Sequence, residues 1–245
     1  MGSMTLPTSS WPPTSVDSSL AVLVSGGLDS AILLAEAVAI YPRVVPIYVE
    51  VGSAWEPVER SYLERFLEAI RTPALDRLVI LEQPIGDVYG RHWSMTGDHV
   101  PDEHSADEAV FLPGRNVLLL AKPLLWCHLN GVPALATAPL VSNPFPDATP
   151  SFYDGFAAIL GQAVGQPAVK VLRPYADLGL HKAEVLKRGQ GMPLDKTFSC
   201  IQPTDGLHCG RCNKCAERRQ GFRDAGMTDP TRYADRPRES TACSA

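Results

Sequence analysis

One junction near the start of the chain leaves few folds open. Residues 20–24 form a short apolar run that predicts a buried parallel strand. Gly26 and Gly27 follow at once, and they let backbone N–H groups turn toward a ligand because neither carries a Cβ. An Ala-rich segment of helical length begins at Asp29, and a helix start offers unpaired donors and a partial positive charge. Strand, glycine turn and helix in this order predict an anion site.

The side chains around the two glycines favour phosphate as the anion. Ser25 and Ser30 can donate hydroxyl hydrogen bonds. Asp29 is unusual in a phosphate cradle, so we expect it either to cap the helix or to act through a bound Mg²⁺. The common ATP motif Gly-x-x-x-x-Gly-Lys-Ser/Thr and the dinucleotide motif Gly-x-Gly-x-x-Gly are both absent. A glycine-rich turn without a ligand is the alternative, and the flanking strand and helix favour the phosphate site.

Strand and helix patterns alternate along the chain. The expected strands are 20–24, 44–49, 78–81, 132–136 and 168–172, and the expected helices are 29–39, 56–71, 117–129, 152–164 and 182–187. Such alternation is typical of a parallel sheet with helices on both faces. The sequence therefore predicts an α/β fold, a doubly wound parallel five-stranded sheet, with a small C-terminal zinc-binding helical region. In helix 56–71 the charged residues, Glu59 among them, are expected to point outward.

The length of 245 residues suffices for one large domain with an appendage. We expect a flexible lead-in at 1–19, a nucleotide-binding domain at 20–190, a four-cysteine region at 191–226 and a tail at 227–245. The polar segment 86–109 shows no clear period, and an internal loop of this length is often a lid or binding element.

Charge and hydropathy limit the function classes. The formal net charge is −5, so no general attraction to nucleic acid is expected. No stretch resembles a membrane span, and the N-terminus lacks a basic region followed by an apolar core. We therefore expect a cytoplasmic protein with no membrane partner.

Cysteine spacing points to a metal. Four of the six cysteines lie close together, namely Cys200, Cys209, Cys212 and Cys215. Four thiolates in the pattern C-x₈-C-x₂-C-x₂-C suit a closed, structural, tetrahedral zinc site. The cations expected to offset their charge are Arg211, Lys214, Arg218 and Arg219. Cys127 lies in an apolar helical pattern and is expected in the core.

An iron–sulfur cluster and a disulfide pair are the alternatives for these cysteines. A ferredoxin-like run normally has its fourth ligand three residues further on, where this chain has Arg218, and this favours zinc. Clustering in a chain without an export signal favours metal over disulfides.

A third motif reads Phe-Leu-Pro-Gly-Arg-Asn at residues 111–116. Arg115 stands where a helix begins, and a cation there opposes the helix dipole, so it is either held by a phosphate or simply at the surface. The loop Ser25–Ser30, this motif and the four cysteines occur in one order. Together they make the chain resemble the 7-cyano-7-deazaguanine synthase family of queuosine precursor synthesis, within the ATP pyrophosphatase (PP-loop) superfamily. The resemblance covers about residues 20–225.

The resemblance implies an adenine nucleotide α-hydrolase-like fold and an ATP-dependent carbon–nitrogen ligase. The carboxylate of 7-carboxy-7-deazaguanine is adenylated, ammonia gives the amide, and a second adenylation permits dehydration to the nitrile. The implied cofactors are ATP, Mg²⁺ and Zn²⁺. The implied catalytic residues are Asp29, Arg115 and Lys182, where Asp29 would hold Mg²⁺ and the two cations would clamp phosphates or the adenylate. The implied nucleotide-binding residues are Ser25, Gly26, Gly27, Leu28, Asp29, Ser30 and Arg115.

Several loops depart from the family pattern. An Asp-Tyr-Gly-Gln-like turn is Glu50-Val51-Gly52-Ser53 here, and a Tyr-Pro-Asp element is Phe145-Pro146-Asp147. An Asp-x-Ser-Gly loop is Val141-Ser142-Asn143-Pro144, and the usual Cys-Arg pair is Ala148-Thr149. The departures leave open a paralogue that joins a deazaguanine carboxylate to another amine and stops at an amide. A PP-loop tRNA sulfur transferase and a non-catalytic zinc-ribbon module are further alternatives, and a homodimer remains open.

Overall fold

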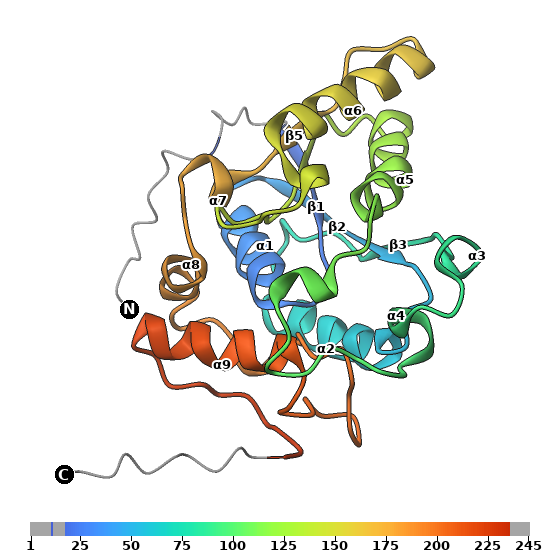
Figure 1. The fold of residues 1–245 in the computed structure, drawn as a ribbon. Coiled ribbons are helices and arrows are strands. Elements are labelled where there is room, and N and C mark those ends of the chain that lie inside the picture. The colour runs from blue at the N-terminus through green and yellow to red at the C-terminus, as the bar shows by residue number, and fades with distance from the viewer. Residues whose placement is uncertain (1–10, 12–17, 236–245) are drawn as a thin grey trace, which may run out of the picture.

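A five-stranded, all-parallel sheet with the order β3-β2-β1-β4-β5 runs through the middle of the protein (Figure 1). The computed structural model describes Trp11 and residues 18–235, so most of the expected lead-in and the end of the expected tail lie outside the described residues. The strands are β1 (Ser19–Leu23), β2 (Arg43–Glu50), β3 (Val79–Glu82), β4 (Ala134–Ala136) and β5 (Lys170–Leu172). The predicted fold class is confirmed.

Helices cover both faces of the sheet. The longer ones are α1 (Leu28–Ile40), α2 (Glu56–Ala69), α5 (Arg115–Leu129), α6 (Pro150–Val164), α8 (Lys182–Arg188) and α9 (Asn213–Ala225). Successive side chains of a strand point to opposite faces. Leu20 and Val22 of β1 therefore pack in the core formed with α1, whereas Ala21 packs in the core beneath α5 and α6. This doubly wound arrangement explains why β1 is apolar from Leu20 to Leu23.

The winding direction of the chain reverses between β1 and β4. β1 pairs with β2 through Ser19 opposite Arg43, and with β4 through Ala21 opposite Leu135. In open α/β sheets, ligands bind beyond the carboxyl ends of the strands at such a switch point. The loop that follows β1 is the serine- and glycine-rich turn, so the predicted anion site lies at the position where this fold binds ligands.

The C-terminal region packs on the same body. Phe222 and Ala225 of α9 lie in the core that α1 forms, and α8 contacts both α1 and α9. The expected domain boundary between residues 190 and 191 stays a prediction.

The segment expected to be a lid lies against the cysteine region. It contains α3 (Gly86–Tyr89) and α4 (Trp93–Thr96), and a 3₁₀ turn at Asp107–Val110 lies at its end. Another short helix, α7 (Pro174–Asp177), lies elsewhere in the chain. Trp93 stacks on Trp55 with ring centroids 5.9 Å apart, and it packs against the cluster that holds the four cysteines. The backbone N–H of Asn213 donates to Pro101 O at 3.0 Å. The segment therefore covers the cysteines, and no residue of it lines the cavities described below.

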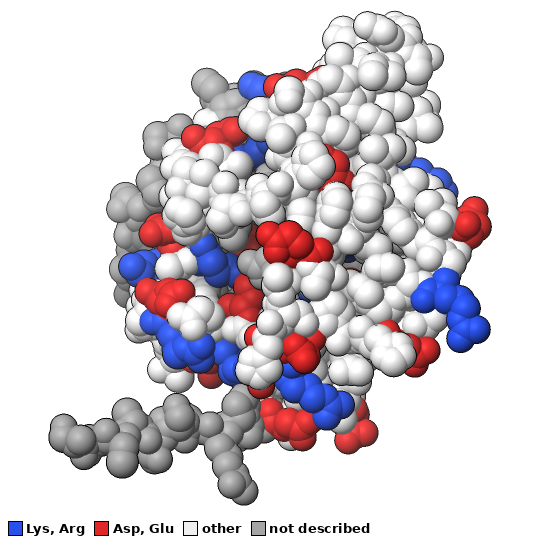
Figure 2. Space-filling view, viewed as in Figure 1, with Lys and Arg blue, Asp and Glu red and all other residues white. Residues whose placement is uncertain are grey.

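Acidic and basic side chains are interspersed around α8 and α9 on the face shown in Figure 2, whereas the region of α6 carries few charges. Within the part of the chain that the structure describes, no helix combines the length and apolar character that a bilayer crossing requires. The absence of a nucleic-acid partner stays a prediction.

A buried ion pair fixes α8 against α1. Glu36 of α1 is fully buried, and Arg188 Nε of α8 lies 2.6 Å from its Oε1. Tyr175 Oη donates to the other carboxylate oxygen at 3.2 Å. Because α8 begins at Lys182, this pair also fixes the position of that lysine.

We expect Glu36→Gln to lower the free energy of unfolding by about 3 kcal/mol, because it leaves the Arg188 charge without its partner in a low-dielectric environment. The matched control is Asp76→Asn, which breaks an exposed 2.8 Å pair with Arg43 and should cost under about 1 kcal/mol. Urea unfolding of both variants measures the difference. Equal losses would contradict a structural role for the buried pair.

Candidate active site and metal site

Two adjoining cavities open beyond the carboxyl ends of β1, β2 and β4. The sheet cavity measures about 310 Å³ and is lined by Leu23, Tyr48, Thr137 and Tyr153 among others. The cysteine-side cavity measures about 320 Å³ and is lined by residues that include Lys182, Phe198, Lys214 and Glu217. Six residues line both cavities, namely Ser25, Gly27, Asp29, Trp55, Glu59 and Arg115. The predicted phosphate loop therefore lies where the two cavities meet.

The loop is shaped by its glycines and serines. Gly26 has a φ of +74°, a conformation that side chains with a Cβ rarely adopt, and a Cβ there would also meet Glu59 O at 3.3 Å. The Ser30 hydroxyl accepts from the Ser25 backbone N–H at 3.2 Å and lies 3.2 Å from the Ser25 hydroxyl. Gly27 is the N-cap of α1 and offers no side-chain hydrogen bond. The start of α1 thus keeps donors available for an anion.

Asp29 belongs to a chain of charges that joins three helices. Lys182 Nζ lies 2.6 Å from Asp29 Oδ2 and 3.2 Å from Glu217 Oε1, and Lys214 Nζ lies 2.6 Å from Glu217 Oε2. Burial opposes the charge of Lys182, but the two carboxylates outweigh it and raise its pKa. Burial likewise opposes the charge of Glu217, but Lys182 and Lys214 lower its pKa to about 2. Lys182 therefore stays cationic at neutral pH beside the phosphate loop.

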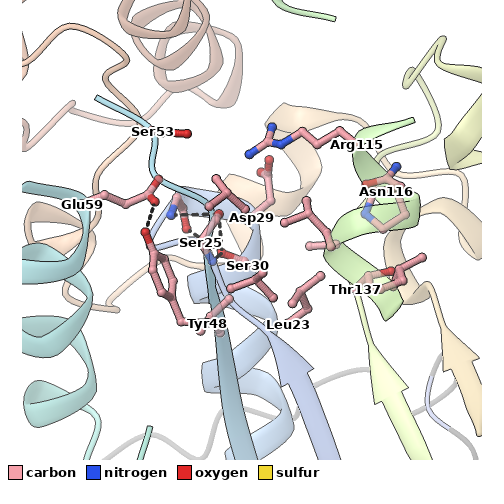
Figure 3. Close-up of a pocket in the computed structure, with 18 of the residues that line it drawn as sticks. Leu23, Ser25, Asp29, Ser30, Tyr48, Ser53, Glu59, Arg115, Asn116 and Thr137 are labelled. Atoms are coloured by element: carbon pink, nitrogen blue, oxygen red, sulfur yellow. Dashed lines mark hydrogen bonds between the residues drawn. The ribbon is translucent and has the colours of Figure 1, made fainter. Parts of the chain in front are cut away.

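Arg115 brings a second cation to the cavities. It is the first residue of α5, and its side chain has neither a hydrogen bond nor an ion pair among the described residues. Figure 3 shows its guanidinium extending over the cavity toward Asp29. Of the two expectations for this residue, a position facing a phosphate fits the structure better than a surface position.

The motif that contains Arg115 is held by the Phe-Pro-Asp element. The Asn116 backbone N–H donates to Asp147 Oδ2 at 3.0 Å, and Asn116 Nδ2 donates to Asp147 O at 2.8 Å. Phe111 stacks on Phe145 with centroids 4.6 Å apart. These contacts join two motifs far apart in the sequence and fix the start of α5. No periodicity in the sequence signals the pairing.

Glu59 was expected to point outward, and this expectation is wrong. Its side chain lines both cavities, and Tyr48 Oη donates to its Oε2 at 2.7 Å (Figure 3). Burial raises the pKa of Glu59 to about 7, although the Tyr48 hydrogen bond and the charge of Arg115 act against this rise. Helical periodicity predicts that an acidic residue near the start of α2 faces solvent. It cannot show that the carboxyl end of a strand lies against that turn.

The four cysteines form a metal-ligand cluster. All four are buried, and their sulfur atoms lie within 4.8 Å of one another. Two pairs, Cys200 with Cys212 and Cys209 with Cys215, have sulfurs 3.9 Å apart. In a tetrahedral zinc site with Zn–S bonds of about 2.3 Å, neighbouring sulfurs are about 3.8 Å apart. The donor set therefore fits a tetrahedral ion, and all four thiols are free of disulfides.

Backbone amides and one buried arginine surround these sulfurs. Cys200 Sγ accepts from the N–H groups of Gln202 and Cys209, and Cys209 Sγ accepts from those of Arg211 and Cys212. Arg218 is 1% exposed and has no carboxylate in ion-pair distance among the described residues. It donates instead to neutral oxygens such as Ser199 Oγ at 3.1 Å and Leu194 O at 2.9 Å.

Three of the four cations expected to offset the thiolates pair with acids instead. Arg211 contacts Asp235 at 3.0 Å, Lys214 contacts Glu217 at 2.6 Å and Arg219 contacts Glu103 at 2.7 Å. Arg218 is the one of the four without a carboxylate in ion-pair distance among the described residues, and its buried guanidinium interacts electrostatically with Tyr233, Asp229 and Cys215. The sequence shows which residues are basic but not which acids fold against them.

Cys127 lines neither cavity and does not belong to the four-cysteine cluster. It is fully buried in the core under α5, as expected, and burial raises its pKa to about 12. A thiol of this kind is unreactive. Among the described residues the remaining cysteines are the four in the cluster.

A glycine turn at a switch point, two cations beside it and four clustered cysteine sulfurs are together the features of a nucleotide-binding α/β protein with a candidate structural metal site. The sequence model of the family described as "Queuosine biosynthesis protein QueC" matches residues 19–226, and the chain belongs to this family.

Several similar curated proteins share one name. A 7-cyano-7-deazaguanine synthase from Solidesulfovibrio magneticus is 34% identical over 86% of this chain and 94% of its own length. Synthases from Rhizobium etli and Thiobacillus denitrificans are 33% identical over 88% and 87% of this chain and over 92% and 97% of their own lengths. Among solved structures, a complex of 4-thiouridine synthetase with RNA and bound ATP matches with a TM-score of 0.47 and 12% identity, over 85% of this chain and 50% of that chain.

We expect Cys212→Ser to lower both metal content and stability, since the binding energy of a structural metal contributes to folding. The control is Cys127→Ser, which disturbs the core but removes no ligand of the cluster. Metal analysis of both variants should show loss of bound metal in Cys212→Ser and wild-type stoichiometry in Cys127→Ser. Iron with acid-labile sulfide in the wild-type protein would contradict zinc as the resident metal.

Proposed function

We propose that this protein is an ATP-dependent carbon–nitrogen ligase that converts 7-carboxy-7-deazaguanine to 7-cyano-7-deazaguanine with ammonia. The observation that carries the proposal is that the phosphate loop and Arg115, whose side chain is unpaired, line the same two cavities. The chain also matches the QueC family over residues 19–226. The match to the Rhizobium johnstonii 7-cyano-7-deazaguanine synthase, for example, covers 91% of that protein's length.

The residues present suit adenylation of a carboxylate. In that step a carboxylate oxygen attacks the α-phosphorus of ATP, the bond to the bridging oxygen breaks, and pyrophosphate leaves with the electron pair. Charge grows on the leaving phosphates, and preorganised donors aimed at that charge lower the barrier. The amides at the start of α1 would bind pyrophosphate, while Arg115 and Lys182 would hold the phosphates on either side.

Two metals fit residues of the site. Asp29 Oδ1 is buried without a hydrogen-bond partner among the described residues, so one carboxylate oxygen remains for Mg²⁺, which prefers oxygen ligands. Bound there, Mg²⁺ would neutralise charge on the phosphates. Zn²⁺ would be held by Cys200, Cys209, Cys212 and Cys215, with no open position for water, and would therefore stabilise the fold.

The amide-forming paralogue and the ligase differ in their product. Mass spectrometry of a reaction with 7-carboxy-7-deazaguanine, ATP and ammonium separates a nitrile from an amide. The nitrile supports the proposal, whereas an amide that accumulates without dehydration would replace it with the paralogue. A sulfur transferase requires a reactive cysteine, and Cys127 is unreactive for the reason given above. A cytoplasmic location and a homodimer stay predictions.

We expect Lys182→Ala to reduce carboxylate-dependent ATP–pyrophosphate exchange by about a hundredfold to a thousandfold, because it removes a preorganised cation from the developing phosphate charge. Lys187→Ala is the matched control, since Lys187 is an exposed lysine of the same helix. This variant should catalyse ATP–pyrophosphate exchange at the wild-type rate. Thermal unfolding of both variants checks that they fold. Wild-type exchange in a folded Lys182→Ala would refute the role of this lysine.

A further inference from the structure

Four carboxylates line the two cavities, and three of them are held by ion pairs or by backbone N–H groups. Asp29 and Glu217 pair with Lys182 at 2.6 and 3.2 Å. Glu56 accepts the N–H groups of Val51 and Gly52 at 2.7 and 2.8 Å, one on each oxygen. Glu59 differs from Asp29 and Glu217 because no ion pair of the described residues includes it, and it differs from Glu56 because a tyrosine hydroxyl rather than two backbone N–H groups donates to it.

Glu59 also lies where the two cavities meet, so a reacting group held between them would lie beside its carboxylate. Its Cγ lies 3.4 Å from the position of a Cβ built on Gly26, so its side chain packs directly on the phosphate loop. Tyr48 donates to one of its oxygens, and the indole of Trp55 interacts with the carboxylate as well. In Figure 3 the Glu59 carboxyl lies across the cavity from the Arg115 guanidinium, with Ser25 and Asp29 between them.

The proposed reaction requires a proton acceptor at this place. When ammonia attacks the acyl carbon of the adenylate, a carbon–nitrogen bond forms, the bond from carbon to the AMP oxygen breaks, and AMP leaves with the electron pair. The nitrogen then carries one hydrogen too many and must lose a proton. Loss of the two remaining amide hydrogens accompanies the later dehydration to the nitrile, with AMP leaving again. A carboxylate within reach of the nitrogen makes these transfers easier.

We propose that Glu59 is the general base that accepts protons from the nitrogen nucleophile, first in amide formation and again in dehydration. This inference rests on the proposed ligase function. Tyr48 acts as a positioning residue, since its hydrogen bond sets the orientation of the carboxylate and favours its ionised form. Asp29, Glu56 and Glu217 keep their structural or phosphate-binding partners throughout.

The protonation equilibrium of Glu59 is suited to this role. Its pKa of about 7 lies near the working pH of most enzymes, where a base can both accept and release a proton. The groups that face it come from several elements, namely Tyr48 from β2, Glu56 from α2, Asp29 from α1, Arg115 from α5, Lys182 from α8, and Lys214, Glu217 and Arg218 from α9. Because the ionised form is the active one, amide formation should fall as the pH decreases through about 7.

The test separates activation of the carboxylate from transfer to nitrogen. We expect Glu59→Gln to keep carboxylate-dependent ATP–pyrophosphate exchange within a few-fold of wild type and to lose about a hundredfold in amide formation from ammonium. Hydroxylamine is unprotonated at neutral pH, but its nitrogen also carries a surplus proton after attack, so hydroxamate formation should fall together with amide formation. The matched control is Glu64→Gln, an exposed acid of the same helix, which should resemble wild type in all three assays.

Other outcomes overturn the inference in distinguishable ways. Wild-type amide formation in Glu59→Gln removes the base role. Equal loss of exchange and amide formation in a folded variant assigns Glu59 to activation instead. Absence of exchange in the wild-type protein defeats the proposed ligase function, and the inference falls with it.

The pH profile of Tyr48→Phe supplies a second readout. Removing the donor to the ionised carboxylate should raise the pKa of Glu59, so the acid limb of amide formation should move to higher pH. The exchange reaction should show no such movement. An unchanged acid limb would mean that a group other than Glu59 titrates in this step.

Discussion

The ion pair between Asp29 and Lys182 is the contact on which the arrangement of the site depends. It joins the first turn of α1, next to the phosphate loop, to the first turn of α8. The two residues are 153 positions apart in the sequence. Glu217 of α9 contacts the same lysine, and α9 begins within the cysteine cluster at Asn213. A metal bound by the cysteines would therefore hold α9 in place, and through Glu217 it would keep Lys182 beside the loop. In this way a structural metal can support a distant phosphate site without any chemistry of its own.

The sheet determines what surrounds this contact. Since β1 lies between β2 and β4, the loops after all three strands converge on one edge. The loop after β1 supplies the phosphate-binding amides, β2 supplies Tyr48, and the region after β4 supplies Thr137. Two cavities that share the phosphate loop and Arg115 would, in the proposed function, let ATP and a second substrate approach the same atoms from two sides. Such convergence is the main requirement for a reaction between two bound molecules.

Much of this architecture follows from local sequence signals. The apolar run of β1, the glycines after it and the cysteine spacing all act within a few residues, so the fold class and the metal cluster could be predicted. Contacts between distant segments could not be predicted in this way. The bond from Asn116 to Asp147, the burial of Arg218 and the inward position of Glu59 depend on which loops the sheet brings together, and no periodicity encodes that. The position of segment 86–109 was not predictable for the same reason, because its partners include the cysteine region, Ala54 and Pro113, which no local pattern connects with it.

The loops that depart from the family pattern fall into those that line the sheet cavity and those that do not. Thr149 caps α6 by accepting from the Phe152 N–H at 3.3 Å, and Ala148 packs in the core beneath α5, so both have structural roles here. Ser53 and Asn143, in contrast, line the sheet cavity. The turn around Ser53 is held by Glu56 through two backbone N–H groups, so its shape is kept by a carboxylate from α2. If this chain differs from its relatives in the substrate or amine it accepts, positions 53 and 143 are the first to test, because neither Ala148 nor Thr149 lines either cavity.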